Sequence, residues 1–210
     1  MGSPEIRRIV ALTLAVAWVS ACAVFPEAPN RPTSRYRLAL DGANPVSWPQ
    51  CPSPAGVLVV SALRDEAAVA SNGIAYLLRP HEVKYYAYSQ WVEDPARQLL
   101  PLVIQALERT NCWTTVTHAE SGLRADYRLD AEILQWQQEF FPTPSRVRLA
   151  FRAELVAPSE RAIVASRRFE LVEEAETGDA YGAVIASNRA VNRWLLALAE
   201  WAKAAASQRR

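Results

Sequence analysis

The chain has 210 residues and a mass of 23.3 kDa, a length that suits one well-buried domain rather than two. Residues 1–21 contain one Glu and two Arg, so a mature chain that starts at residue 22 has 21 basic and 21 acidic residues. A nucleic-acid-binding protein normally carries a basic excess, so this balance argues against that class and nucleic acid is not expected as a partner.

The N-terminal segment is typical of a bacterial export signal. A basic start precedes an apolar run over residues 9–18, and Val19-Ser20-Ala21-Cys22 closes it with small residues before a cysteine. The run is shorter than the roughly 20 residues of a transmembrane helix, so residues 1–21 are predicted to be a cleaved signal. The last four residues resemble the lipobox of lipoproteins, in which the cysteine is acylated; an ordinary signal with a chance cysteine is the alternative. Ala23, where retained inner-membrane lipoproteins have Asp, favours the outer membrane.

The mature chain divides into a lipidated tether over residues 22–34, rich in proline, and a single domain over residues 35–206. Its two remaining cysteines, Cys51 and Cys112, are a candidate disulfide in an oxidising periplasm, and two buried free thiols are the alternative. Closing this loop would constrain the unfolded chain by roughly 4 kcal/mol in the entropic model. Neither cysteine lies in a sequence context that activates a thiol.

The first half of the domain combines short strands with one helix. The helix starts at an Asp94 N-cap followed by Pro95 and ends near Asn111. The strand before it carries four aromatic residues, which are interpreted as core rather than as a binding site. A continuous apolar run predicts a strand over residues 56–63, and further strands are predicted over residues 36–40, 74–78, 82–89 and 113–118.

The second half has clear period-two alternation over residues 127–133, 146–155 and 163–171. One face of these strands is therefore buried, and the other carries opposite charges that can pair across strands. The apolar phase slips after Ile133, which predicts a bulge or an exit from the sheet. Phe140 and Phe141 form an apolar hairpin tip, a candidate interaction surface unless they pack on the domain's own edge.

A last helix, capped by Asp179, runs to about Ala206 and places Trp194 and Trp201 on one face, most simply against the sheet. Together these elements predict an α+β fold with a largely antiparallel sheet and two main helices packed on one face.

Several short motifs, taken in order, resemble the ABC-type transport auxiliary lipoproteins, which include the PqiC-like partners of MCE lipid-transport systems. The resemblance covers about residues 35–201 of the chain. Its residues are Cys22; Tyr86, Ser89, Trp91, Pro95 and Leu99; Gly122, Ala125, Asp126, Tyr127 and Leu129; Ala165-Ser166-Arg167-Arg168-Phe169; and Asn188-Arg189-Ala190.

This resemblance implies an outer-membrane lipoprotein that faces the periplasm and assists an ABC transporter and an MCE-domain protein in moving phospholipids or other hydrophobic molecules. It implies a sandwich similar to the N-terminal domain of TolB, and it is compatible with a homo-oligomer. The chain is expected to act as an adaptor tethered by acyl chains on Cys22. A structural or assembly lipoprotein without a transport role is the alternative.

An enzymatic function is not expected. The two histidines, His81 and His118, belong to no metal-spacing or triad-like motif, and the chain has no Gly-x-Ser-x-Gly, His-Glu-x-x-His or glycine-rich phosphate loop. No cofactor, metal site or catalytic residue is therefore predicted. A periplasmic hydrolase is the least favoured alternative.

Overall fold

Strand β7 (Tyr127–Glu139) organises the fold, because other strands pair with both of its edges. The computed structural model describes residues 31–40, 47–65, 72–141 and 143–208. The chain divides into two units, Met1–Pro32 and Thr33–Arg210, and the elements below belong to the second. The predicted signal over residues 1–21 and the predicted lipidation site Cys22 lie outside the described residues.

The nine strands found in these ranges form one sheet. One edge of β7 pairs antiparallel with β8 (Arg146–Ala157), which pairs antiparallel with β9 (Ala162–Glu174). The other edge of β7 pairs in parallel with β2, β3 and β4 in turn. These three strands and the other three of the first half have the bounds β1 (Ser34–Tyr36), β2 (Val57–Val60), β3 (Arg64–Asp65), β4 (Gly73–Leu77), β5 (Val83–Trp91) and β6 (Thr115–His118).

The predicted α+β class with two main helices is confirmed. The sheet is mixed, but its long ladders, β7 with β8 and β8 with β9, are antiparallel as expected. Parallel pairing is confined to ladders of two to four residue pairs. The chain thus commits its longest pairings to local hairpins, which need no crossover connection.

Helix α2 (Pro95–Glu108) begins as the sequence predicts. The Asp94 carboxylate accepts a hydrogen bond of 2.7 Å from the Ala96 amide, and Pro95 stands in the first turn, where a missing N–H costs nothing. Its apolar stripe, which includes Leu99, Val103 and Leu107, is buried. Helix α2 therefore packs by this stripe against β2 and β6.

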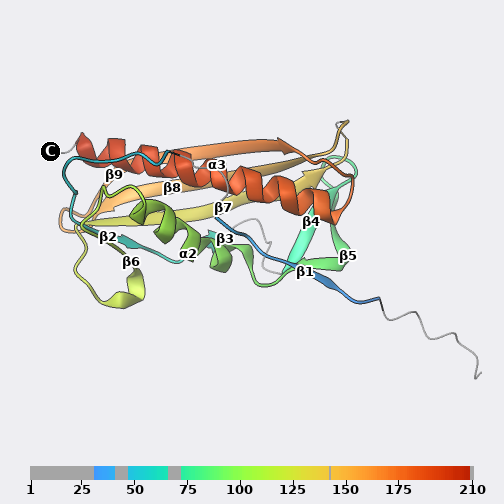
Figure 1. Ribbon diagram of the computed structural model, residues 1–210, viewed down its shortest axis with the longest axis horizontal. Coiled ribbons are helices and arrows are strands. Elements are labelled where there is room, and N and C mark those ends of the chain that lie inside the picture. Colours follow the sequence, from blue (N-terminus) through green and yellow to red (C-terminus); the bar gives the residue numbers. More distant parts are fainter. Residues whose placement is uncertain (1–30, 41–46, 66–71, 142, 209–210) are drawn as a thin grey trace, which may run out of the picture. The chain divides into compact units, whose positions relative to one another are not determined.

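Helix α3 (Ala180–Ser207) runs along the long strands in Figure 1. Asp179 caps it by accepting from the Gly182 amide at 2.8 Å. Trp194 is fully buried and stacks on Phe151 of β8, with 4.1 Å between ring centroids, and Trp201 meets Phe169 of β9 edge-on. The predicted tryptophan face is confirmed as the contact between α3 and the sheet.

The two helices contact each other and cover one face of the sheet. Side chains of β7, β8 and β9 alternate between that face and the opposite one. The opposite face, which neither α2 nor α3 covers, is called the helix-free face below. It carries charged alternate residues of the three strands, including Glu132, Glu139, Arg148, Arg152 and Arg168.

The predicted first strand over residues 36–40 is wrong in its bounds. The strand is Ser34–Tyr36, parallel to the end of β5, and the chain then leaves the sheet. The backbone of the next residues is hydrogen-bonded to side chains instead. Gln98 accepts from the Leu38 amide at 2.9 Å, and Asn188 accepts from the Ala39 amide at 2.9 Å. The sequence predicted a short strand here, but side-chain bonds to the backbone replace a ladder beyond Tyr36.

The strand predicted over residues 56–63 is shorter in the structure, where β2 covers Val57–Val60 and the chain leaves the ladder at residues 61–63 before β3 begins at Arg64. Gly56 has φ of +103°, and an added Cβ there would collide with the Asp126 side chain, so this position requires glycine. The bulge predicted after Ile133 is confirmed, since the register of β7 against β8 shifts between Ile133 and Gln135.

Candidate functional site

The two domain cysteines, predicted as a candidate disulfide, are joined in the structure. The Cys51 and Cys112 sulfurs are 1.99 Å apart, and the bond ties the loop before β2 to the segment that follows α2. The Ala55 amide also donates to the Cys112 carbonyl at 2.7 Å. Cys112 belongs to the core and Cys51 packs against it, so the disulfide is part of the domain's structural framework.

The two phenylalanines of the hairpin tip, predicted as a candidate interaction surface, differ in exposure. Phe140 packs edge-on against Tyr76 of β4, with 5.9 Å between ring centroids, whereas Phe141 is 45% exposed. The packing alternative therefore holds for Phe140, and the interaction surface stays a prediction for Phe141. Phe141 remains available for contact with a partner, and Phe140 belongs to the domain.

The four aromatic residues of β5 differ in burial, and the register between β4 and β5 is irregular within this strand. Trp91 is buried against Trp136, as its core interpretation predicted. Tyr86 donates its hydroxyl to Gln138 at 2.7 Å, and burial, followed by the nearby Asp179 charge, raises the Tyr86 pKa. Tyr85 and Tyr88 are 44% and 50% exposed, so the core interpretation is wrong for these two residues.

Two buried carboxylates on the helix-free face form ion pairs with arginines. Glu139 lies 3.0 Å from Arg146 and 2.9 Å from Arg148, and Glu132 lies 2.8 Å from Arg152. These pairs are the cross-strand charges that the alternating sequence predicted. Since the carboxylates are almost fully buried while the arginines are partly exposed, each arginine replaces water around a buried charge.

The protonation state of Glu139 is set by its hydrogen-bond donors. Burial alone would raise its pKa, but hydrogen bonds donated by Arg148, Arg146 and Gln137 outweigh burial and hold the pKa below its ordinary value of 4.5. The same bond to Glu139 raises the pKa of Arg148. Glu139 is therefore ionised and fully engaged at neutral pH, a poor arrangement for accepting a proton from a substrate.

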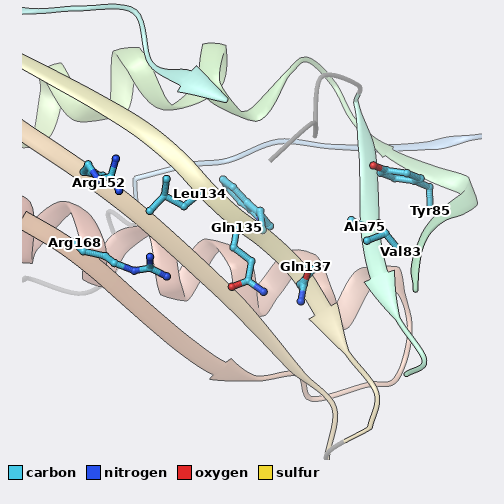
Figure 2. A pocket seen from close by; sticks show the side chains of 9 residues that line it. Ala75, Val83, Tyr85, Leu134, Gln135, Gln137, Arg152 and Arg168 are labelled. Carbon is cyan, nitrogen blue, oxygen red and sulfur yellow. The ribbon is translucent and has the colours of Figure 1, made fainter. Parts of the chain in front are cut away.

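A hollow of about 390 Å³ opens on the helix-free face, between the β4–β5 hairpin and strands β7, β8 and β9 (Figure 2). Arg152 and Arg168 lie at one end of it, Val83 and Tyr85 at the other, and Gln135 and Gln137 between them. Ala75, Leu134 and Trp136 complete the lining.

The hollow lies where the ladder on one edge of β7 is interrupted. Strand β3 pairs with Glu132 and Ile133, and β4 resumes the pairing at Gln138 and Glu139. Among the described residues, no strand pairs on that edge with residues 134–137. Sequence reasoning missed this site because its lining comes from five strands, and the bulge signal at Ile133 was its one local trace.

The two histidines occupy loop positions away from the hollow. His81 adopts a positive φ of 69° in the turn before β5, and His118 is half exposed at the end of β6, with its Nδ1 4.0 Å from Glu120. Within the described ranges, no group of three His, Cys, Asp or Glu residues is placed to hold a metal ion. No helix in those ranges is long and apolar enough to cross a bilayer.

The motif residues that carry the family resemblance mostly hold the fold together. Asp126 accepts from the Val57 amide at 2.8 Å, and Asn188 accepts from the Ala39 amide at 2.9 Å. Arg189 donates to the Glu174 carbonyl at 2.7 Å and so links α3 to the end of β9. Arg168 is different, because its side chain lines the hollow.

Comparison with known proteins gives a family and a fold. A family model described as the ABC-type transport auxiliary lipoprotein component matches residues 36–199. Protein XCC0632 from Xanthomonas campestris, of the family DUF330, is 21% identical with a TM-score of 0.68, over 84% of this chain and 95% of that one. A second solved structure, of an uncharacterized protein, is 15% identical with a TM-score of 0.63, over 80% and 97%. No curated protein matches.

Proposed function

The chain belongs to the family of ABC-type transport auxiliary lipoprotein components, and from this premise we propose that it is an outer-membrane lipoprotein that assists an ABC transporter and an MCE-domain protein in lipid transport. The observation that carries the proposal is the family match over residues 36–199, which spans nearly all of the described domain. In this proposal the domain faces the periplasm and acts as a tethered adaptor.

The proposed anchor is Cys22, acylated after removal of residues 1–21. Support comes from the lipobox-like residues 19–22 and from the lipoprotein family. Acyl chains contribute about 0.8 kcal/mol of membrane affinity per buried CH₂, so several chains hold a domain on a bilayer. Ala23 supports the outer membrane as the site of attachment.

The proposed adaptor contributes no catalytic step. The buried carboxylates that a hydrolase would use, Glu132 and Glu139, are saturated by arginines, and Glu139 has a lowered pKa. Phe141 offers an exposed apolar side chain at the hairpin tip for contact with a partner. These features suit protein contact better than acid–base chemistry.

The anchor is tested by intact mass of the protein purified from membranes, with inner and outer membranes separated. We expect a mass gain of diacylglyceryl size and an outer-membrane location, both lost in Cys22→Ala. An unmodified periplasmic protein would contradict the proposal.

The partners are tested by cross-linking the full chain in cells and identifying what co-purifies. We expect MCE and ABC components, with recovery reduced by Phe141→Ser and unchanged by Leu123→Ser, a matched exposed residue in another loop. Recovery of other envelope proteins without transporter components would favour the structural or assembly role. Cross-linked ladders of the chain itself would report a homo-oligomer.

A further inference from the structure

The hollow on the helix-free face combines positive charge with exposed apolar surface. Arg152 of β8 and Arg168 of β9 stand directly opposite each other in the ladder. Like charges in directly opposed positions destabilise a sheet, so nearby negative charge stabilises this pair. Each arginine has one carboxylate partner, at 2.8 Å for Arg152 with Glu132 and 2.9 Å for Arg168 with Glu170.

Those two carboxylates leave positive charge at this end of the hollow. Glu132 is shared, since Arg64 also lies 3.3 Å from it, so three arginines face two carboxylates. The side chains of Arg152 and Arg168 are 48% and 55% exposed. A guanidinium has five N–H donors and each of these pairs uses one nitrogen, so donors remain for a ligand.

The opposite end of the hollow is apolar. Val83 is 52% and Tyr85 is 44% exposed, and the two alternate positions lie on the same side of β5. Leu134, at the bulge of β7, lies between them and the arginines in Figure 2, together with Gln135 and Gln137. A small inorganic anion would leave this apolar end unused, and a neutral apolar molecule would leave the arginines unused.

We propose that this hollow binds an amphiphilic anion, with a phosphate or carboxylate head between Arg152 and Arg168 and an apolar tail along Leu134, Val83 and Tyr85. The planar guanidinium fork suits both head groups. A volume of about 390 Å³ lies within the range of small-molecule sites. The site goes beyond the adaptor role, because it requires neither a transporter nor a lipid anchor.

The test uses the full chain purified in a neutral maltoside detergent and a sixteen-carbon fatty acid that carries a photoreactive diazirine in its tail. Labelled peptides are identified by mass spectrometry. We expect labelling in the peptides that contain Val83, Tyr85 or Leu134. The double variant Arg152→Gln/Arg168→Gln should lower this labelling by about tenfold, the effect of losing charge-assisted hydrogen bonds.

Two further variants separate binding from folding. Arg124→Gln removes an exposed arginine outside the hollow and should leave labelling unchanged. Tyr85→Ser leaves every charge in place and should still lower labelling. Thermal unfolding of each variant shows whether it is folded. Labelling that persists in a folded double variant would overturn the proposal.

Competition decides the ligand class. Hexadecyl phosphate should displace the probe, whereas inorganic phosphate and hexadecanol should not. Displacement by inorganic phosphate would make the hollow a simple anion site, and displacement by hexadecanol would make it a purely apolar one. Either result would overturn the proposal, and neither bears on whether Cys22 is acylated or which proteins co-purify with the chain.

Discussion

The two faces of strands β7, β8 and β9 exclude water from their side chains in different ways. On the covered face, Leu149, Phe151 and Leu155 have no exposed surface, because α3 lies over the strands. On the helix-free face, Glu132 and Glu139 are equally hidden, but arginines cover them. The first face is held by packing and the second by ion pairs whose outer ends remain in water, so the second can bind a ligand without disturbing the core.

The largest expected effect is on the covered face. Trp194→Ala should lower the free energy of unfolding by about 3–5 kcal/mol, because it removes a fully buried ring stacked on Phe151. Urea unfolding measures this loss. Trp194→Phe is the control: it keeps an aromatic ring and removes an indole N–H that has no hydrogen-bond partner within the described part of the chain. An equal loss in both variants would show that packing of this ring is not what holds the face.

The next effect tests whether the helix layer also depends on a covalent link. Cys51→Ser/Cys112→Ser should lower the free energy of unfolding by about 2–4 kcal/mol, since the bond closes a loop between residues 61 apart in sequence. The wild-type protein measured with a reductant should match the variant. If the reductant leaves its unfolding midpoint unchanged, the bond does not contribute in solution.

On the helix-free face, Glu139→Gln should cost about 1–3 kcal/mol at pH 7, because Arg146 and Arg148 lose a charged acceptor. The pKa of Glu139 is lower when folded than its ordinary value of 4.5, so its stabilisation is complete above pH 4.5 and is lost as the pH falls below it. The difference between wild type and variant should therefore shrink from pH 5 towards pH 3, as measured by urea midpoints. Glu170→Gln, at a half-exposed pair, is the control and should show little change. A difference that grows on acidification would reverse the sign assigned to this site.

The smallest effect is expected at the hollow. Arg168→Gln should change the free energy of unfolding by less than about 0.5 kcal/mol, because its pair with Glu170 is solvated and its loss relieves repulsion with Arg152. Thermal unfolding checks this. A large loss would show that Arg168 serves the fold, and the contrast between the two faces would then be weaker than described.

The sequence predicted the covered face well, because that face follows local rules. Period-two alternation gave β7, β8 and β9, and the seven-residue spacing of Trp194 and Trp201 gave the contact of α3. The helix starts at Asp94 and Asp179 were also correct, since an N-cap is chosen within a few residues.

The hollow was not predictable in the same way. Tyr85, Leu134 and Arg152 become neighbours through the order of strands in the sheet, and alternation within one strand does not fix that order. The early end of β2 at Val60 had the same origin, because an apolar run does not show where its pairing with another strand stops. The first strand was misplaced because Asn188 and Gln98, far along the chain, bind its backbone.

The contacts that attach β1 to the domain are the first to bear a force applied from the N-terminal side. Strand β1 pairs with the end of β5, and Asn188 and Asn192 of α3 bind the backbone at Ala39. A force transmitted from the N-terminal side therefore loads these short contacts first, and they lie at the edge of the sheet rather than at β7. Under load, β1 is expected to separate from β5 before the long antiparallel ladders part. The helix-free face, with its hollow, would therefore stay intact while the domain is pulled.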